Sequence, residues 1–210
     1  MRLGALFLCI IGAYLIGSVS FAIVASWIFR LPDPRSYGSG NPGATNVLRS
    51  GKRAAALLTL LGDAAKGLVA VLLGRHFAPL IGFGEGTVAA SALAVFLGHL
   101  YPLYFRFKGG KGVATAAGIL LGLSPWVALV AFVAFVTTAV LSRYASLASI
   151  IAVFAAVVVS PIALGWSADL AAVVLIAALI VWRHRANIRR LQSGTEGRLN
   201  LRRSSAPPAS

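Results

Sequence analysis

The sequence predicts an all-α membrane protein with seven transmembrane helices joined by short interfacial helices or loops. Hydrophobic residues make up 59% of its 210 residues and charged residues only 11%, whereas a soluble domain is about 45–50% apolar even with glycine counted. The apolar residues form runs whose length approaches the roughly 20 residues that a helix needs to cross a bilayer. The short alternating segments typical of an outer-membrane barrel are not evident, so helices are the predicted elements.

Breaks at proline, glycine and charged residues divide the apolar sequence into seven predicted spans. They are residues 3–29, 54–74, 87–105, 112–123, 125–141, 146–164 and 168–182. The first is long for the core of a signal peptide and lacks a clear small-residue cleavage site, so we expect it to be retained. The fourth is short for a full crossing, and a re-entrant segment is the alternative for it.

The basic residues predict the orientation of these spans. With the N-terminus outside, the inner loops carry nearly all the lysines and arginines, and the outer side keeps only Arg2 and Arg75. Because cytoplasmic loops are enriched in Lys and Arg, we expect the N-terminus outside and the C-terminus in the cytoplasm. The same rule explains much of the net charge of +14, which therefore does not indicate a nucleic-acid partner.

The domain organisation is expected to be simple. Residues 1–203 are predicted to form a single integral membrane domain, because the connections between spans are too short to hold a soluble domain. Residues 204–210 contain only Ser, Ala and Pro and are predicted to be a disordered tail. The lone Cys9 excludes an intramolecular disulfide and a cysteine-based metal site.

Three polar segments interrupt the apolar sequence, and the predicted orientation places all three on the cytoplasmic side. The first, residues 38–49, contains Asn41 followed by Pro42, a pair typical of a helix start. A helix beginning there would bring Asn41, Thr45 and Arg49 onto one face and would present an anion-binding N-terminus. The alternative is an ordinary interfacial turn followed by a solvated arginine.

The second polar segment, Lys108-Gly109-Gly110-Lys111-Gly112, precedes another apparent helix start. Its glycines lack a Cβ, which would allow the backbone to approach a ligand closely. The segment is not a Walker A loop, since Lys111 is followed by glycine rather than Ser or Thr, and ATP binding is not predicted. The alternative is that Lys108 and Lys111 only flank a span on its cytoplasmic side.

The third polar segment, residues 183–191, places His184 and Asn187 on one helical face. His184 could act as a general base, as a hydrogen-bond donor to phosphate, or as an interfacial histidine without a role. Arg183 and the other arginines of the segment are expected to anchor lipid headgroups. Glu196 is one of only five acidic residues in the chain, and we expect it to pair with an arginine.

Two ionisable residues fall inside a predicted span. Asp63 and Lys66 are three residues apart on one helix, so their charges can neutralise each other. A proton or ion path is the alternative for ionisable groups within a membrane. A structural ion pair is the preferred interpretation, because the spans offer no further acid to continue a relay.

The polar segments together resemble those of a known enzyme family. They read Ser-Gly-Asn-Pro-Gly-Ala-Thr-Asn at 39–46, Gly98-His99 with Tyr101-Pro102 before Lys-Gly-Gly-Lys-Gly-Val-Ala-Thr at 108–115, and His184-Arg-x-Asn187-Ile-x-Arg190-Leu191-x-x-Gly194-x-Glu196. In this order and spacing, the chain resembles the bacterial membrane-integral acyl-phosphate:glycerol-3-phosphate acyltransferases, the PlsY family, from the first span to about Glu196. The resemblance implies a multi-pass protein of the bacterial inner (plasma) membrane with its active site on the cytoplasmic face.

The resemblance implies a reaction as well. A seven-helix enzyme of this family transfers a fatty acyl group from acyl phosphate to the 1-hydroxyl of sn-glycerol 3-phosphate. The products are lysophosphatidic acid and phosphate, and the reaction is the first step of phospholipid biosynthesis. Acyl phosphate, glycerol 3-phosphate and membrane lipids are then the expected partners, with no cofactor and no metal. The sequence leaves the oligomeric state open, and a monomer is compatible with it.

The resemblance further implies which residues hold each substrate. For glycerol 3-phosphate they are Ser39, Arg49, Lys111, His184 and Asn187, and the last four of these are also the expected catalytic residues. For acyl phosphate they are Asn41, Gly43, Thr45, Asn46, Gly109, Gly110, Lys111, Gly112 and, as a weaker addition, Ser149.

The residues fit this chemistry on independent grounds. Both substrates carry phosphate, which Arg49 can bind as a fork and Lys111 as a point charge. No activated Ser or Cys nucleophile with a nearby base is evident, so direct attack by the glycerol hydroxyl without an acyl-enzyme is predicted. Either His184 or the substrate phosphate could accept the proton. A membrane transporter for phosphate or another anion is the alternative function.

Overall fold

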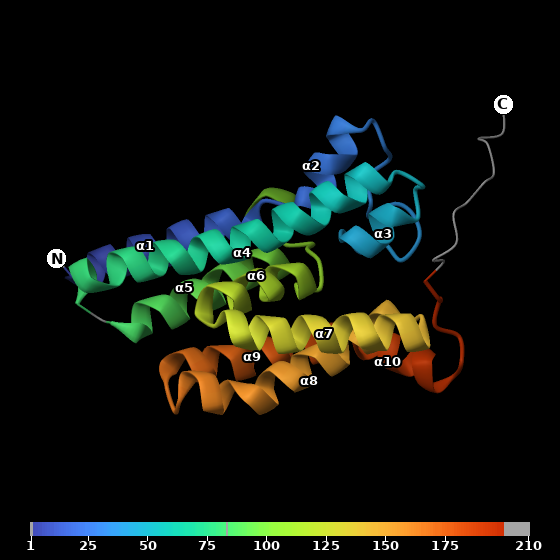
Figure 1. Ribbon diagram of the computed structural model, residues 1–210. Coiled ribbons are helices and arrows are strands. Elements are labelled where there is room, and N and C mark those ends of the chain that lie inside the picture. Colours follow the sequence, from blue (N-terminus) through green and yellow to red (C-terminus); the bar gives the residue numbers. More distant parts are fainter. Residues whose placement is uncertain (1, 83, 200–210) are drawn as a thin grey trace.

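The computed structural model describes residues 2–82 and 84–199, and every element in this part of the chain is a helix (Figure 1). The all-α prediction is therefore confirmed for the described residues. The predicted tail at residues 204–210, and the last residues of the predicted domain, lie outside them.

The first predicted span, residues 3–29, is two helices rather than one. Helices α1 (Arg2–Ser18) and α2 (Phe21–Ile28) are bent by 42° relative to each other. At the break, the ammonium group of Lys66 donates a 2.6 Å hydrogen bond to the carbonyl oxygen of Val19. A side chain that inserts into the hydrogen-bond ladder of a helix can kink it. Lys66 lies 47 residues from Val19, so the hydrophobicity of residues 3–29 alone could not predict this bend.

Six longer helices follow, and each overlaps one of the remaining predicted spans. They are α4 (Arg53–Ile81), α5 (Glu85–Leu100), α6 (Val113–Leu123), α7 (Pro125–Ser142), α8 (Ala145–Leu164) and α9 (Ala168–Arg183). Short helices precede or follow them: α3 (Ala44–Leu48), the 3-10 helix η1 (Leu103–Phe105) and α10 (Arg185–Gln192). α4 continues past residue 74, its predicted end, and stops at Gly82, whose left-handed φ of 80° is typical of a helix end.

Several of these helices are suited to cross a membrane. By length and composition, α4, residues 86–105, α7 and α8 each qualify. The bent pairs α1–α2 and α9–α10 pass the same test, which brings the candidate spans of the described residues to as many as six. α6 is apolar but shorter, as the sequence predicted. The structure therefore has the architecture of a multi-pass helical bundle.

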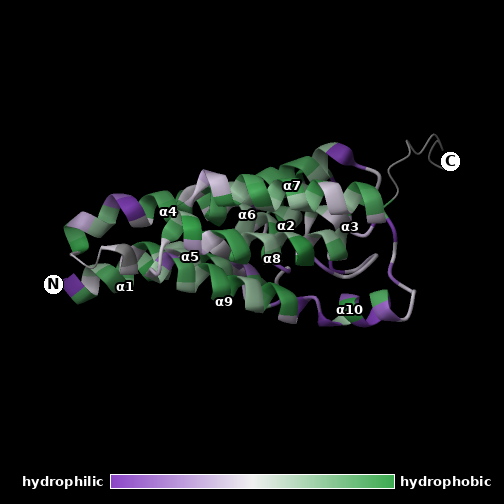
Figure 2. Cartoon of the chain, turned by 60° about the horizontal axis from the view of Figure 1, so that its bottom comes forward, coloured by the Kyte–Doolittle hydropathy of each residue, from purple (hydrophilic) through white to green (hydrophobic). Residues whose placement is uncertain are grey.

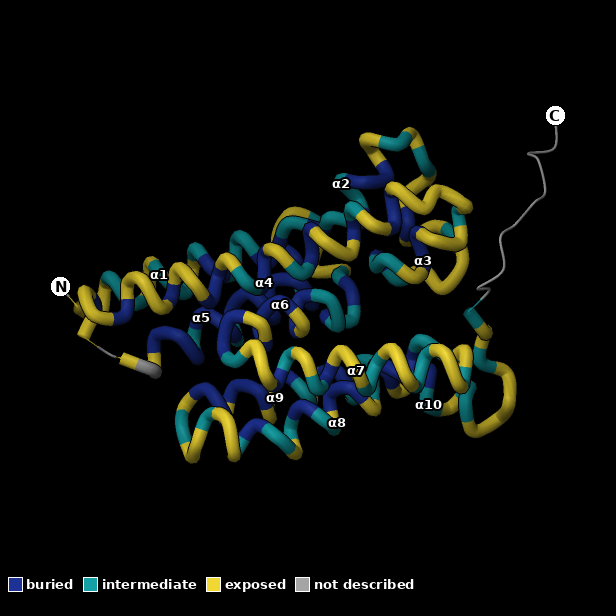
Figure 3. Tube along the Cα trace, in the orientation of Figure 1, coloured by how far each residue is buried: buried dark blue, intermediate teal, exposed yellow. Residues whose placement is uncertain are grey.

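The helices consist mainly of hydrophobic residues, whereas hydrophilic residues collect toward the ends of the bundle (Figure 2), and many large hydrophobic side chains are exposed on its surface. Leu141, Ile162 and Trp166, for example, are 80%, 87% and 94% exposed. Small and apolar residues are buried where the helices face one another (Figure 3). Such a surface matches lipid hydrocarbon, in which only helices with internally satisfied backbone groups are stable.

Glycines bring the helices that carry the site into close contact. A Cβ added to Gly98 of α5 would lie 2.2 Å from the carbonyl oxygen of Tyr14 in α1. A Cβ added to Gly118 of α6 would lie 1.8 Å from the carbonyl oxygen of Ala64 in α4. Neither position has room for a side chain, as is usual where membrane helices pack through small residues. These contacts fix α5 and α6, which flank the glycine-rich segment.

Candidate active site

The three polar segments lie at one end of the bundle, opposite the N-terminus, where α3 and α10 are found (Figure 1). The glycine-rich segment connects α5 to α6 at the same end and reaches α10 through a hydrogen bond between Lys111 and Asn187. Residues far apart in the sequence therefore meet, and their polar groups can act on one ligand.

Asn46 shapes the loop that precedes α3. Its amide oxygen accepts a 2.9 Å hydrogen bond from the backbone nitrogen of Ser39. Its amide nitrogen donates to the carbonyl oxygens of Pro34 at 2.7 Å and Tyr37 at 3.2 Å. Because Asn46 is only 2% exposed and both ends of its amide are engaged, it positions the loop. The expected contact between Asn46 and acyl phosphate does not fit this geometry.

The predicted helix start at Asn41 and Pro42 is wrong. α3 begins at Ala44, and its N-cap is Gly43, whose carbonyl oxygen accepts hydrogen bonds from the backbone nitrogens of Asn46 and Val47. Asn41 therefore precedes the helix and shares no helical face with later residues. With only five residues, α3 also offers no strong helix dipole to an anion. The local start signal was overridden by the contacts of Asn46.

The glycines of the second segment serve packing against the protein. A Cβ added to Gly109 would lie 2.1 Å from the carbonyl oxygen of His99, and one added to Gly110 would lie 2.4 Å from the His99 imidazole. The backbone nitrogen of Gly110 donates a hydrogen bond to that same carbonyl oxygen at 3.2 Å. At these two positions, the close approach of the loop to α5 requires glycine. The sequence had instead predicted that glycine allows the close approach of a ligand.

Arg183 holds the glycine-rich segment from the other side. Its Nη2 donates hydrogen bonds of 3.0 Å to the carbonyl oxygens of Gly109 and Gly110, and its Nε donates to Gly110 at 3.2 Å. The expected role of Arg183 as a lipid headgroup anchor is therefore wrong. Binding two successive carbonyl groups orients the peptide units of this loop, so that their N–H groups face away from the guanidinium.

A buried ionic network supports the segment from within the bundle. Lys66 and Asp63 form a 2.8 Å ion pair, and the Nδ1 atom of His99 lies 3.6 Å from the same carboxylate oxygen. All three side chains are at most 6% exposed. The predicted structural pair is thereby confirmed. Sequence reasoning did not connect His99 to this pair, because His99 lies on a different helix.

Lys111 belongs to a chain of hydrogen bonds that ends at Glu196. Its Nζ donates to the Oδ1 atom of Asn187, whose Nδ2 donates to Oε1 of Glu196 at 2.6 Å. Ser146 donates to the same carboxylate oxygen at 2.6 Å, and Arg190 forms a 2.7 Å ion pair with Oε2. The predicted pairing of Glu196 with an arginine is confirmed. Glu196 thus fixes which way the Asn187 amide points and so presents its oxygen to Lys111.

The sequence pattern indicated no particular role for Ser146, and for Glu196 it predicted only pairing with an arginine. The sequence offered one signal for Glu196, which is the scarcity of acidic residues. A lone carboxylate among many basic residues can be expected to interact with more than one of them. No comparable signal existed for Ser146, which is one of several serines in its region.

The electrostatic surroundings of Lys111 are strongly positive. Its pKa is lowered to about 8, chiefly by burial; Glu196 opposes this shift, and Arg190, Arg183 and Arg49 add to it. Four cations thus act around a single carboxylate. An anion with two negative charges would offset their mutual repulsion and raise the pKa of Lys111 again.

His184 is a buried, neutral imidazole at pH 7. Burial is the main cause that lowers its pKa to about 4; the hydrogen bond with Ile180 opposes the shift, and the charge of Lys111 adds to it. The Nδ1 atom lies 2.8 Å from the carbonyl oxygen of Ile180, so Nδ1 carries the proton. The Nε2 atom of a neutral imidazole is then a hydrogen-bond acceptor.

Glu196 is held as a carboxylate. Burial alone would raise its pKa, but hydrogen bonds from Ser146, Asn187 and Arg190 outweigh burial and lower that pKa. The segment after α10 that carries Glu196 also approaches Arg49, since a Cβ added to the adjacent Gly197 would lie 3.3 Å from Nη2 of Arg49. Arg49 of the first polar segment therefore lies next to the segment that carries Glu196.

The structure brings some of the expected site residues together and leaves others apart. Lys111, His184 and Asn187 form one cluster, with Arg49 at its edge. Among the remaining expected residues, Gly110 and Gly112 flank Lys111, and the backbone nitrogen of Arg49 donates a 3.0 Å hydrogen bond to the carbonyl oxygen of Asn46. Ser39 and Thr45 are exposed on the loop and on α3, Asn41 and Gly43 lie in the connection between them, and Gly112 caps α6 with a φ of 84°.

Ser149 is also separate from the cluster. Its hydroxyl donates a 2.8 Å hydrogen bond to the carbonyl oxygen of Ala145 in its own helix, and the side chain is buried. An internal helical hydrogen bond satisfies the hydroxyl without a ligand. The expected contact of Ser149 with acyl phosphate therefore does not fit the structure.

The fold and the site together define a multi-pass membrane protein with a positively charged polar centre at one end of its helical bundle. In the described part of the chain, no three His, Cys, Asp or Glu side chains group as they would around a metal ion. The groups that gather at this centre are cations, the Glu196 carboxylate, neutral hydrogen-bonding side chains and backbone N–H groups.

Comparisons with known proteins show which family has this arrangement. Residues 7–194 match the family described as glycerol-3-phosphate acyltransferase. A glycerol-3-phosphate acyltransferase of Nitrosospira multiformis is 53% identical over 93% of this chain and 97% of its own length. One of Herminiimonas arsenicoxydans is 55% identical over 92% and 94%. The chain belongs to the glycerol-3-phosphate acyltransferase family.

Solved structures agree with this assignment. A crystal structure of PlsY, an integral membrane glycerol 3-phosphate acyltransferase, in its glycerol 3-phosphate form superimposes with a TM-score of 0.86 at 39% identity. That match covers 93% of this chain and 96% of the other. The lysophosphatidic acid form of PlsY gives a TM-score of 0.84 at 38% identity. The fold and the sequence therefore point to one family.

Proposed function

We propose that this chain transfers a fatty acyl group from acyl phosphate to the 1-hydroxyl of sn-glycerol 3-phosphate, which yields 1-acyl-glycerol 3-phosphate and phosphate. This would be the first step of phospholipid biosynthesis. The observation that carries the proposal is the cluster of Lys111, Asn187 and His184, with Arg49 at its edge, at the polar end of an apolar bundle. Family membership supports acyl transfer and favours it over the alternative of anion transport.

Glycerol 3-phosphate is assigned to the positively charged cluster. Lys111 and Arg49 would bind its phosphate, the first as a point charge and the second through its planar fork. Asn187 and His184 would hold the glycerol hydroxyls, and Ser39 would close the site from the loop before α3. The cluster and its neighbours carry at least two more positive charges than negative ones. This excess matches the charge of a phosphate dianion and supports the assignment. A crystal structure of the related PlsY enzyme in its glycerol 3-phosphate form supports glycerol 3-phosphate as the substrate.

Acyl phosphate is assigned to the space beside the two loops. Its phosphate would accept hydrogen bonds from the backbone N–H groups at Gly112 and the first turn of α6, an eleven-residue helix. Gly109, Gly110 and Lys111 would form one wall, and Asn41, Gly43 and Thr45 the other. Asn46 supports this wall from behind. The acyl chain would remain in the lipid along the apolar outer surface of the bundle.

The reaction needs no covalent intermediate on the protein. The 1-hydroxyl oxygen attacks the carbonyl carbon of acyl phosphate, the new ester bond forms, and the bond from that carbon to the phosphate oxygen breaks. The hydroxyl proton must go to a base. With a pKa of about 4, His184 is a weaker base than a phosphate monoester, whose second pKa is about 6. We assign the proton to substrate phosphate and assign His184 the role of orienting the hydroxyl through Nε2.

The pH dependence distinguishes the two bases. If phosphate accepts the proton, kcat falls as the pH decreases through about 6, because the protonated phosphate can no longer accept. A His184→Gln variant should then be slower but keep this acidic limb. An acidic limb near pH 4 that disappears in His184→Gln would instead identify the histidine as the base.

We also propose the membrane topology. The bent pair α1–α2 and the helices α4 to α9 would cross the inner membrane of a bacterium seven times, with α6 as a short span and α10 at the cytoplasmic end. The N-terminus would lie outside and the C-terminus in the cytoplasm, because the basic loops gather at the end of the bundle that carries the site. A single domain and a monomer would suffice for the reaction. Labelling of cysteines introduced at the two ends of α4 would check this orientation.

Reconstitution of the purified chain tests the proposed function. In proteoliposomes with palmitoyl phosphate and glycerol 3-phosphate, we expect lysophosphatidic acid and phosphate in equal amounts. Acyl-CoA in place of the acyl phosphate should give no product. Phosphate movement across the bilayer without acyl transfer would contradict the proposal and support the transporter alternative.

A further inference from the structure

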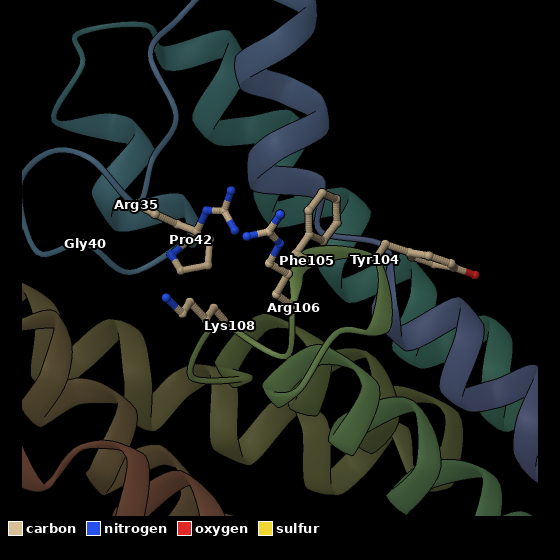
Figure 4. Close-up of a pocket in the computed structure, with 8 residues that line it drawn as sticks. Arg35, Gly40, Pro42, Tyr104, Phe105, Arg106 and Lys108 are labelled. Carbon is tan, nitrogen blue, oxygen red and sulfur yellow. The ribbon is translucent and has the colours of Figure 1, made fainter.

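The site is open on one side and closed on the other. Beside the glycine-rich segment, a cavity of about 560 Å³ is lined by residues that include Arg35, Arg106 and Lys108 (Figure 4). His184 and Asn187, to which the glycerol hydroxyls are assigned, do not line this cavity and are only 3% and 6% exposed. A substrate from the cytoplasm can therefore reach these two side chains only if part of the protein moves.

Residues 193–199, the C-terminal strap, cover Asn187. The strap follows α10 and runs toward the loop that carries α3 (Figure 1). The Glu196 carboxylate accepts the 2.6 Å hydrogen bond from the Asn187 amide, and the Glu196 side chain is only 8% exposed. Thr195 and Gly197 on either side of it are exposed. The strap therefore has solvent on one face and the site on the other.

Contacts at the far end of the strap join it to the turn between α7 and α8. The backbone nitrogen of Leu199 donates a 2.6 Å hydrogen bond to the carbonyl oxygen of Arg143. The Nε atom of Arg198 donates a 3.2 Å hydrogen bond to the Tyr144 hydroxyl, and the Cζ atom of Arg198 lies 5.5 Å from the centroid of the Tyr144 ring. These contacts of Arg198 and Leu199 form a latch, because they tie the strap to helices other than α10.

The turn gives this latch a fixed support. The Ser142 hydroxyl donates a 2.7 Å hydrogen bond to the carbonyl oxygen of Thr138 and accepts a 3.1 Å hydrogen bond from the backbone nitrogen of Tyr144. Tyr144 is thus held at the start of α8 by the end of α7.

The strap can move more easily than the turn. Gly194 and Gly197 lie on either side of Glu196, and glycine allows the backbone to rotate at both positions. Arg198 is exposed, and exposed cation–π and polar contacts are weak. The latch can therefore open while the helical bundle stays folded.

We propose that the C-terminal strap is a gate over the glycerol 3-phosphate site, and that Tyr144 and Arg198 are positioning residues that hold the gate closed. This gate rests on the proposed function, because glycerol 3-phosphate is its ligand. In the closed state, Glu196 orients the Asn187 amide; in the open state, the ligand enters or leaves. The latch contacts the strap and not the ligand, so it stabilises the closed state equally with and without ligand.

A gate of this kind has a kinetic signature. While the open fraction is small, weakening the latch raises it by the same factor in the free and in the bound protein. The rate constants for association and dissociation of glycerol 3-phosphate then rise together, and the dissociation constant does not change. A latch that only shaped the site would instead speed dissociation alone and weaken binding.

The rate constants are measured with radiolabelled glycerol 3-phosphate and the full chain in phosphatidylcholine nanodiscs. Arg198→Gln removes both contacts of the guanidinium, so both rate constants should rise about threefold with an unchanged dissociation constant. Arg198→Lys, which keeps the charge and a donor, should restore most of the original rates. Tyr144→Phe, which keeps the ring but loses the hydroxyl, should have a smaller effect than Arg198→Gln.

The matched control is Arg185→Gln. Arg185 also lies over an aromatic ring, with its Cζ atom 4.7 Å from the centroid of Trp182, but it is at the start of α10 and the strap follows the end of that helix. Loss of this positive charge can only slow the association of an anionic ligand. The test and control variants should therefore change the association rate constant in opposite directions or, at high ionic strength, only the test variant should change it.

A covalent latch should have the reverse effect. In a Cys9→Ala background, Tyr144→Cys and Arg198→Cys are joined by a reducible bismaleimide before ligand is added. Both rate constants should then fall by at least about tenfold, and reduction should restore them. Equal rates before and after reduction would overturn the gate.

The other outcomes also decide the proposal. Faster dissociation with weaker binding in Arg198→Gln, or equal changes in Arg198→Gln and Arg185→Gln, would overturn the gate. Acyl transfer is not the readout, so a chain that transfers acyl groups but fails these tests loses the gate alone. A chain that binds no glycerol 3-phosphate would overturn both the gate and the proposed function.

Discussion

Two groups of charged residues in this protein differ in how their charges are balanced. Inside the bundle, Lys66 meets Asp63 at 2.8 Å and also donates to the Val19 carbonyl, so its positive charge is neutralised locally. At the end of the bundle, Glu196 is the carboxylate that acts on Lys111, while Arg49, Arg183 and Arg190 add positive charge around it. A balanced pair is suited to structure, whereas an excess of one sign is suited to binding an oppositely charged ligand.

The two groups are nevertheless connected. His99 lies 3.6 Å from the Asp63 carboxylate through its Nδ1 atom, and its carbonyl oxygen accepts the hydrogen bond of Gly110. The inner group thus positions the segment that presents Lys111 to the outer one. In a membrane bundle, the local sum of charge therefore indicates the role of an ionisable residue as well as its depth does.

The largest expected effect is the loss of activity on removing a cation from the outer group. Lys111→Ala should lower kcat/KM by about a thousandfold, because a charged donor aimed at substrate phosphate or at developing negative charge is lost. The melting temperature should stay the same or rise, since mutual repulsion among the cations decreases. Acyl transfer by the variant and thermal unfolding in detergent give the two readings. Lys52→Ala is the control, and a parallel fall in its activity would show a nonspecific effect of surface charge.

Removal of a charge from the inner group should act on stability instead. Asp63→Asn leaves Lys66 buried without a counter-charge and should destabilise the fold by about 3–5 kcal/mol. The double variant Asp63→Asn/Lys66→Met removes both charges and should recover most of this loss. Unfolding of both variants is followed by thermal denaturation. A double variant as unstable as the single one would show that the ion pair is not the source of the effect.

A smaller effect is expected at the guanidinium that holds the glycine-rich segment. Arg183→Lys cannot bind the carbonyl groups of Gly109 and Gly110 in the same forked way, so kcat/KM should fall by about tenfold with the fold intact. Steady-state kinetics in proteoliposomes measure the change. The neighbouring exposed Arg185, changed to Lys, serves as the control. Equal losses at both positions would argue against a specific role for Arg183.

The last expected effect concerns pH. The pKa of Lys111 is lowered to about 8, and its cationic form is the one that binds phosphate. As the pH rises through about 8, the free enzyme loses this charge, so kcat/KM should fall by up to about tenfold per pH unit. Lys111→Arg should lower activity but move the alkaline limb to higher pH, because arginine stays protonated. An alkaline limb unchanged by this substitution would assign the titration to another group.

The sequence predicted the helical bundle and the common location of the polar segments because both follow from simple constraints. An apolar chain of this length must cross the bilayer as helices, and its polar segments must lie at the ends of those helices. The structure accordingly brings Lys111 and Asn187 within hydrogen-bond distance.

Other features depended on contacts that local patterns do not encode. The bend between α1 and α2 is associated with Lys66, which lies 47 residues from the carbonyl group that it binds. Arg183 resembles a headgroup anchor in sequence but binds a loop 74 residues away. The start signal at Asn41 and Pro42 was overridden by Asn46, whose amide organises the preceding loop. Each of these three predictions failed because a side chain forms hydrogen bonds with backbone groups outside its own local sequence pattern.

Binding of glycerol 3-phosphate tests the distinction between the two groups most directly. Equilibrium binding of radiolabelled glycerol 3-phosphate to the purified chain should weaken at least about tenfold in Lys111→Ala. It should be retained in Asp63→Asn/Lys66→Met, measured at a temperature where that variant is folded. If the unsubstituted protein binds glycerol 3-phosphate and the Lys111→Ala variant binds it equally well, the assignment of this cluster as the substrate site is contradicted.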